Sequence, residues 1–103
     1  MKIVAVTACP TGIAHTYLAA ESLEKSAEKK GVEIKVETQG SIGIENELTK
    51  EDIEAAVAVI IAADVNISKA DRFKGKPKLK LDVQQAIKHS DQIINKIIAK
   101  FSE

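Results

Sequence analysis

The chain has 103 residues, the length of one compact domain, and 15 basic and 15 acidic residues balance to a formal charge of zero. Without a net charge there is no overall field to attract nucleic acid or an anionic membrane, and the few aromatic residues offer little surface for stacking bases. No apolar run reaches the roughly 18 residues of a membrane-spanning helix and no signal peptide follows Met1, so a single cytoplasmic domain over 1–103 is predicted.

The first part of the chain predicts two strands separated by a helix. Lys2–Thr7 is apolar and rich in branched residues, which is typical of a strand buried on both faces. Over Ile13–Gly31 the apolar residues recur at spacings of three and four, which predicts an amphipathic helix with Tyr17 on its buried face. Val32–Glu37 alternates strictly, which predicts a half-exposed strand with Glu37 facing water.

Two more strands and two helices are expected in the remainder. Thr49 and the acidic residue three positions later resemble a capping box, which predicts a short helix over Lys50–Ala56. Val57–Ala63 is a second wholly apolar strand, and Lys78–Leu81 is an alternating one. Isoleucines at helical spacing predict a last helix in the tail, with Ser90 as its cap.

Strands that alternate with helices predict an α/β fold, here a three-layer sandwich with a parallel sheet of four strands. The two wholly apolar strands belong in the middle and the alternating ones at the edges, which gives the flavodoxin-like or Rossmann-like order 2-1-3-4. In such a sheet a crevice opens beyond the carboxyl ends of strands 1 and 3, where the direction of the connections reverses. Two loops meet there, one holding Cys9 and the other opening with Asp64.

Cys9 is the only cysteine, so no disulfide forms within the chain, and with two histidines it makes no recognisable zinc pattern; no cofactor is predicted. A lone cysteine is often just a small core residue. Here, however, it lies between a central strand and a helix, where unpaired N–H groups and the helix dipole favour an anion such as a thiolate. The same groups bind phosphate oxygens, and Gly12 allows close approach, so the loop suits a phosphoryl group carried on sulfur.

The spacing after Cys9 can be compared with that of cysteine-dependent phosphatases. Those enzymes place an arginine after five intervening residues and then Ser or Thr, because the guanidinium stabilises the transition state. Here His15 takes the position of the arginine and Thr16 follows, and the aspartate that serves as general acid is absent. The loop is therefore predicted to accept a phosphoryl group and protect it from water. Alternatively, His15 bonds only its own turn, and Thr11 and Thr16 only cap the helix.

The segments CPTGIAHTYLAAESLEKSAEKKG, VETQGSIGIENELT and IIAADV, with ADRFKGK downstream, resemble the fructose-specific IIB component of the bacterial phosphoenolpyruvate-dependent sugar phosphotransferase system. The resemblance covers nearly the whole chain. It implies that Cys9 takes a phosphoryl group from a phosphohistidine of the IIA component and passes it to fructose, or a related sugar, bound in the membrane-embedded IIC component. The residues expected to bind the phosphoryl group are Thr11, Gly12, Ile13, Ala14, His15 and Thr16.

Other residues allow two interpretations each. Asp64 either orients the cysteine loop or caps the turn after its strand, and capping is favoured. The Gln39–Gly43 segment either contacts a partner protein or forms a polar turn, and the turn is favoured. Arg72, the only arginine, invites a phosphate-binding role, but a surface ion pair with Asp71 is favoured. The lysines of Lys74–Lys80 either form a solvated edge that blocks strand addition, which is favoured, or meet an acidic partner.

Two other functions are compatible with this fold. A low-molecular-weight phosphatase or arsenate reductase would need the arginine and the general acid that the sequence lacks. A flavin-binding or nucleotide-binding module would share the fold, but it would carry a GxGxxG fingerprint or a hydroxyl-rich phosphate loop, and neither occurs in the sequence.

Overall fold

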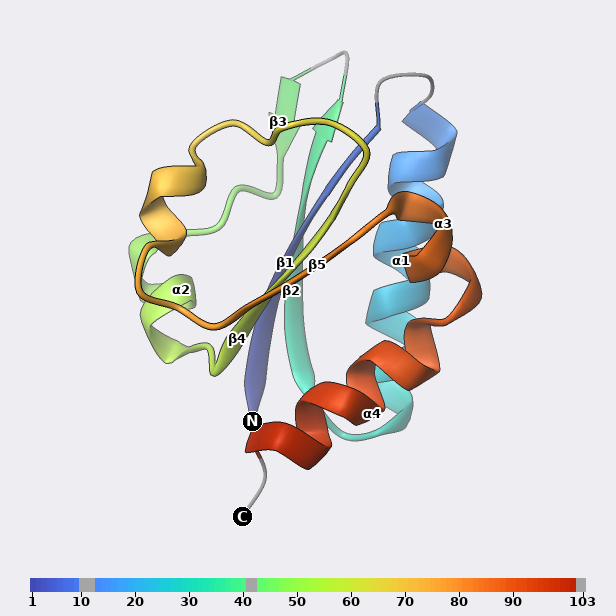
Figure 1. Ribbon diagram of the computed structural model, residues 1–103, viewed down its shortest axis with the longest axis vertical. Helices are drawn as coiled ribbons and strands as arrows, with labels where there is room; N and C mark the ends of the chain where they lie inside the picture. Colours follow the sequence, from blue (N-terminus) through green and yellow to red (C-terminus); the bar gives the residue numbers. More distant parts are fainter. Residues whose placement is uncertain (10–12, 41–42, 102–103) are drawn as a thin grey trace.

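Figure 1 shows the computed structural model of the chain, which describes residues 1–9, 13–40 and 43–101. A five-stranded sheet has the order β3-β2-β1-β4-β5. Its strands are β1 (Lys2–Ala8), β2 (Glu33–Gly40), β3 (Gly43–Glu45), β4 (Ala58–Ala63) and β5 (Lys78–Leu81). The helices are α1 (Ile13–Lys29), α2 (Lys50–Ala55), α3 (Val83–Lys88), α4 (Ser90–Phe101) and the 3-10 helix η1 (Ala70–Phe73).

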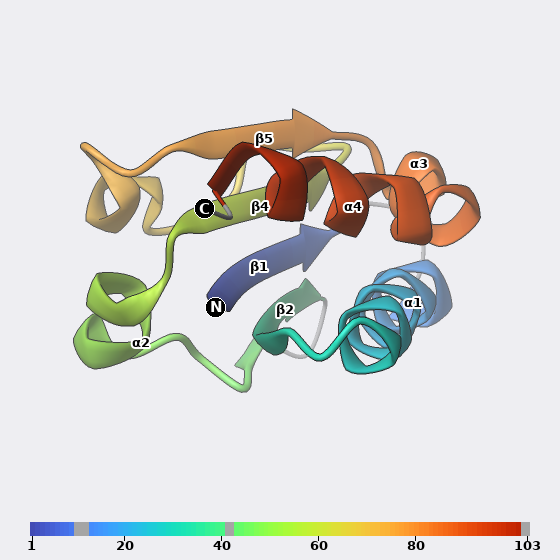
Figure 2. The same ribbon diagram turned by 90° about the horizontal axis from the view of Figure 1, so that it is seen from below.

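The helices lie on both faces of the sheet, which makes three layers. Figure 2 shows α1, α3 and α4 on one face and α2 with η1 on the other. The start of β1 and the end of α4 lie at the same end of the molecule (Figures 1 and 2). Within the described ranges, no helix is both long enough and apolar enough to cross a membrane.

The order predicted for the four long strands matches that of β2, β1, β4 and β5, which are mutually parallel. The prediction of a four-stranded, wholly parallel sheet is nevertheless wrong, because β3 adds a fifth strand antiparallel to β2. β3 has only three residues, too few to produce an alternating pattern. Gly43, at its start, has a φ of +108, a conformation that other residues rarely adopt.

Each face of the sheet packs into its own apolar cluster. The cluster beneath α1, α3 and α4 includes Ile3, Ala5, Leu23, Ile60 and Ile94. The cluster beneath α2 and η1 includes Val4, Val6, Ile53, Val59 and Phe73. Because β1 and β4 contribute alternate residues to both clusters, they are apolar throughout, as parallel strands buried on both faces must be.

The buried face of α1 is displaced from the predicted one. It consists of Thr16, Ala19, Ala20, Leu23, Ser26 and Ala27. Tyr17, which was expected on this face, is 39% exposed, and its hydroxyl donates a hydrogen bond to the carboxylate of Glu45 in β3. The small residues let α1 lie close to the sheet, whereas a phenol is better placed where its polar tip finds a partner.

Side-chain caps define where the shorter helices begin. The predicted capping box of Thr49 and Asp52 is confirmed at the start of α2. α4 begins at Ser90, whose hydroxyl accepts a hydrogen bond from the Ser26 hydroxyl, and the capping role of Ser90 stays a prediction. A second capping box, of Asp82 and Gln85, opens α3, a helix that the sequence analysis did not predict. The signal was present in the sequence as an acidic residue followed three positions later by a glutamine.

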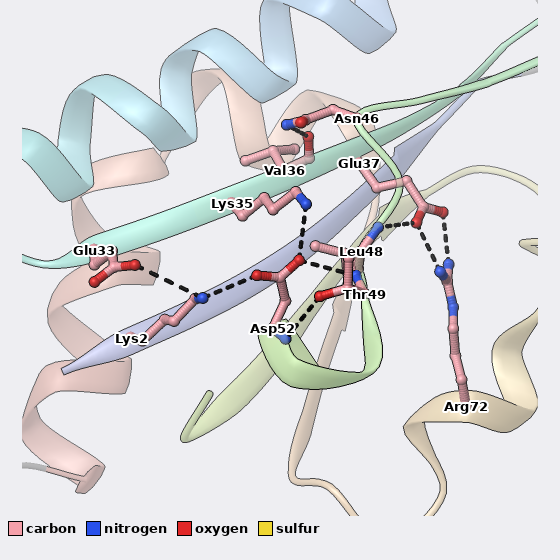
Figure 3. A network of polar contacts seen from close by, with 10 residues as sticks. All are labelled: Lys2, Glu33, Lys35, Val36, Glu37, Asn46, Leu48, Thr49, Asp52 and Arg72. Atoms are coloured by element: carbon pink, nitrogen blue, oxygen red, sulfur yellow. Dashed lines mark hydrogen bonds and ion pairs between the residues drawn. The ribbon is translucent and has the colours of Figure 1, made fainter. Parts of the chain in front are cut away.

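Asp52 also joins α2 to the sheet (Figure 3). Its carboxylate accepts hydrogen bonds from Nζ of Lys35 at 2.8 Å and Nζ of Lys2 at 3.0 Å. The bond from Lys35, followed by that from the backbone N–H of Thr49 and that from Lys2, holds the pKa of Asp52 well below its usual range.

The lowered pKa of Asp52 makes the free energy of unfolding depend on pH. Because the pKa is lower in the folded than in the unfolded protein, the carboxylate stabilises the fold above pH ~4, and this contribution is lost as the pH falls further. We expect Asp52→Asn to lower the free energy of unfolding at pH 7 and to flatten its decline between about pH 5 and 3. Urea unfolding across that range measures both effects. Equal declines in parent and variant would contradict the assignment.

Candidate functional site

The strand register places two polar residues side by side at the carboxyl end of the sheet. Ala8 of β1 is paired with Ala63 of β4, and the residues that follow them are Cys9 and Asp64. The prediction that these two loops meet is therefore confirmed. The site lies beyond the two central strands, at the end of the molecule opposite the start of β1 (Figure 1).

Asp64 contacts the thiol and is fixed by its own neighbours. Sγ of Cys9 donates a hydrogen bond to Oδ2 of Asp64 at 3.7 Å. The other oxygen, Oδ1, accepts from the backbone N–H of Val83 at 3.2 Å, and the Asp64 N–H donates to the carbonyl of Ala8 at 3.1 Å. The side chain of Asp64 thus contacts Cys9 and the first residue of α3. These bonds favour the orienting role over the predicted cap of the turn after β4.

Cys9 is half-buried and packs against the apolar cluster beneath α1. Part of the residue's surface stays exposed to solvent. A groove of about 840 Å³ opens next to Asp64, and its lining includes Ala63, Val65, Ile67, Ala70 and Lys80. Val65 is 43% exposed, which gives the rim of this groove an apolar contact surface.

The residues predicted to bind phosphate fall partly within the described segments. α1 begins at Ile13, and Ala14 and His15 are exposed in its first turn. Thr11 and Gly12 lie outside the described residues. The predicted use of backbone N–H groups in this loop therefore stays a prediction.

Thr16, by contrast, is buried at 1% exposure. Its carbonyl accepts a hydrogen bond from the hydroxyl of Thr7 at 3.1 Å, which ties the first turn of α1 to β1. Its own hydroxyl has no hydrogen-bond partner among the described residues. A buried hydroxyl normally finds a partner, so Thr16 retains a donor close to the cysteine loop.

Arg72 is paired with Glu37, which contradicts the predicted surface pair with Asp71 (Figure 3). Its two terminal nitrogens donate to the two carboxylate oxygens at 2.7 and 2.6 Å. Glu37 is fully buried, although the alternation of β2 predicted that it faces water. The buried charge is tolerated because the carboxylate also accepts from Nε2 of Gln39 and from the N–H of Leu48.

This arrangement keeps Glu37 ionised. Burial alone would raise its pKa, but the hydrogen bonds from Arg72, Gln39 and Leu48 outweigh burial and lower it. A single arginine in a lysine-rich chain was the only sequence signal for such a bidentate pair.

Gln39 extends the network to the loop that begins with Asp64. Its Oε1 accepts from the N–H of Ser68 at 2.8 Å, and its Nε2 donates to the Ser68 carbonyl at 3.0 Å. The interpretation of Gln39–Gly43 as a simple polar turn is thus incomplete, since Gln39 belongs to β2 and links it to the loop after β4. In the segments that the structure describes, no group of three or more His, Cys, Asp or Glu side chains is placed to hold a metal ion.

The family model and the similar proteins of known name all belong to the PTS system. The family described as "PTS system, Lactose/Cellobiose specific IIB subunit" matches residues 4–96. The PTS system fructose-like EIIB component 2 of Escherichia coli K12 is 53% identical over 102 residues, which cover 99% of this chain and 96% of that protein. The PTS system fructose-specific EIIABC component of Bacillus subtilis is also 53% identical, over 92% of this chain but 15% of that protein.

Solved structures agree with these relatives in fold. A crystal structure of a domain of the fructose-specific IIABC component from Borrelia burgdorferi has a TM-score of 0.87 and 54% identity, and covers 92% of this chain and 90% of that one. The solution structure of an enzyme IIB subunit of the PTS system from Escherichia coli K12 has a TM-score of 0.91 and 40% identity, with coverage of 99% and 97%.

Proposed function

Because this chain belongs to the IIB subunit family of the phosphotransferase system, we propose that the thiol of Cys9 is the group that carries the phosphoryl group. The chain is a IIB domain of the fructose type, a phosphoryl carrier in sugar uptake. The observation that carries the assignment of Cys9 is its position. The only thiol of the chain is half-exposed at the carboxyl end of a central strand and hydrogen-bonded to a carboxylate.

The proposed route runs between two partner components. A phosphohistidine of IIA donates the phosphoryl group to Cys9, and a sugar bound in the membrane component IIC receives it. Relatives whose names combine A, B and C units in one protein support this pairing. The names of the relatives favour fructose or a related sugar as acceptor, and because the partners meet on the inner side of the membrane we place the domain in the cytoplasm.

The chemistry forms a phosphocysteine. The sulfur attacks phosphorus, and the thiophosphate is held by the first turn of α1 until the sugar hydroxyl displaces it. The loop lacks the arginine with which phosphatases stabilise the attack of water, so the carried group is protected. The similar proteins are named as components of the phosphotransferase system. Their names do not favour a phosphatase, an arsenate reductase or a flavin-binding module.

The proposal is tested by loading the protein. Incubation with phosphoenolpyruvate, the general phosphotransferase proteins and a IIA component should add the mass of one phosphoryl group. Peptide mapping under neutral conditions should locate it on Cys9. A protein that gains no mass, or that carries the group on His15 instead, would refute the assignment of the thiol.

A variant of His15 tests whether this side chain contacts the carried group. We expect His15→Ala to slow transfer to the sugar by about tenfold to a hundredfold, which corresponds to one phosphate contact worth roughly 1.5 to 3 kcal/mol. His15→Arg restores the phosphatase spacing and should instead shorten the lifetime of the phosphoprotein in water. Both effects are read from the decay of phosphorylated protein with and without IIC.

The matched control is His89→Ala, because His89 is also exposed but follows α3. It should change neither transfer nor lifetime. If the parent phosphoprotein already hydrolyses within seconds and neither variant of His15 alters that, the loop does not protect a phosphoryl group.

A further inference from the structure

The carboxylate of Asp64 lies within hydrogen-bond reach of the thiol that must lose its proton. Sγ of Cys9 lies 3.7 Å from Oδ2, within the range for a hydrogen bond from sulfur. The register of β1 and β4 and the two backbone bonds to Ala8 and Val83 fix the carboxylate at this place. A general base must lie within hydrogen-bond reach of the proton it abstracts, and Asp64 satisfies this requirement.

We propose that Asp64 is a catalytic residue that accepts the thiol proton as Cys9 takes up the phosphoryl group, an inference that rests on the proposed function of Cys9. As the bond between sulfur and phosphorus forms, the bond between phosphorus and the donor nitrogen breaks and leaves its electron pair on nitrogen. The S–H bond breaks at the same time, its electron pair goes into the new S–P bond, and the proton moves to Oδ2. The products are a thiophosphate and a neutral carboxylic acid.

Electrostatics favours the same assignment. A phosphoryl group on sulfur brings two negative charges next to a carboxylate that is held in place by β1 and α3. An ionised Asp64 would repel this group, whereas a protonated one removes the repulsion and becomes a hydrogen-bond donor. The proton also remains next to the sulfur, available to return when the phosphoryl group leaves for a sugar hydroxyl, whose own proton passes to a base of the acceptor component.

The other ionisable side chains near Asp64 have separate roles or positions. Lys80 of β5 lines the same groove. Asp82 caps α3, with Oδ1 accepting from the N–H of Gln85 at 2.7 Å. His15 lies exposed in the first turn of α1. Among the described residues, the hydrogen bond of Cys9 to Oδ2 of Asp64 places this carboxylate in reach of the thiol proton.

The test compares loading rates of the parent and Asp64→Asn with phosphorylated IIA as donor. The asparagine keeps an oxygen for the Val83 N–H but is not a base. We expect loading to slow roughly 100-fold at pH 6.5 and the difference to shrink toward pH 9, where thiolate forms in water without an acceptor. Asp71→Asn makes the same change of charge at an exposed residue outside the site, and should load like the parent.

Slow loading of Asp64→Asn could come from the loss of a base or from damage to the site, and alkylation of Cys9 by iodoacetamide distinguishes these two causes. Asp64→Asn should react at pH 7 at least as fast as the parent, because removing a negative charge next to sulfur favours the thiolate. Loading at the parent rate at pH 6.5, or a loss of loading that is equal at every pH, would overturn the role of Asp64 while leaving Cys9 as the carrier. If the parent gains no phosphoryl group, the assignment of Cys9 itself fails.

Discussion

Replacing Cys9 by serine is expected to abolish phosphoryl transfer and to leave the fold intact. The hydroxyl occupies nearly the same volume but stays protonated at neutral pH, so it cannot act as the nucleophile that a thiol provides. Cys9 packs only partly against the apolar cluster beneath α1, so its replacement removes little packing. Incorporation of phosphate from phosphorylated IIA measures the loss, and urea unfolding measures the stability.

Two outcomes for Cys9→Ser, full activity and failure to fold, have different consequences for the role of the thiol. Full transfer activity in Cys9→Ser would remove the thiol from the mechanism. A variant that fails to fold would leave the chemistry undecided, and for that case Cys9→Ala provides a second non-nucleophilic replacement. Both variants should unfold in urea at nearly the parent midpoint, since Cys9 packs only partly against its apolar neighbours.

The largest expected effect on stability follows from removing the partner of Glu37. Arg72→Met retains much of the side-chain volume but leaves a fully buried carboxylate without its bidentate cation. Breaking one side of a buried ion pair costs about 3 to 5 kcal/mol, a large share of the stability of a domain of this size. The free energy of unfolding in urea at pH 7 measures this loss.

The stability difference between the parent and Arg72→Met should depend on pH in a definite direction. In the parent the pKa of Glu37 is lowered, so its contribution is present above the unfolded value of about 4.3 and is lost as the pH falls. Without Arg72 the effect of burial dominates, and the folded pKa rises above the unfolded one. As the pH falls, protonation of Glu37 removes its buried charge in the variant. The difference in free energy of unfolding between parent and variant should therefore narrow from pH 7 to pH 4.

A double variant supplies the control. Glu37→Gln with Arg72→Met removes both charges and should recover much of the stability lost in the single variant. If Arg72→Met were as stable as the parent at pH 7, the pair would not be the support that its geometry implies.

The central part of the fold could be predicted because burial leaves a direct signal in the sequence. β1 and β4 are buried on both faces, and their unbroken apolar runs indicated both the strands and their central position. β3 escaped prediction because three residues carry no period. α3 was missed although its capping box could have been recognised.

The errors at Glu37 and Arg72 have a common physical cause. Alternation predicts that one side of a strand faces water, but the carboxyl end of β2 is covered by Leu48 and η1, and this cover comes from distant parts of the sequence. Only the assembled fold brings the cation to the carboxylate. By contrast, the meeting of the loops that hold Cys9 and Asp64 could be predicted, because it follows from the central position of two apolar strands; only the direct bond between the two side chains required the register.

Neither terminus of the described chain covers the end of the molecule that holds the candidate site. β1 starts and α4 finishes at the end of the molecule opposite the carboxyl end of β1, which Cys9 follows (Figures 1 and 2). A polypeptide attached at either terminus could therefore act as a tether without obstructing the thiol. On a flexible tether the domain would meet a partner at an effective concentration set by linker length, in the millimolar range for short linkers. The same arrangement suits a domain that stands alone and one that forms a part of a longer protein, as the match to 15% of the EIIABC component of Bacillus subtilis illustrates.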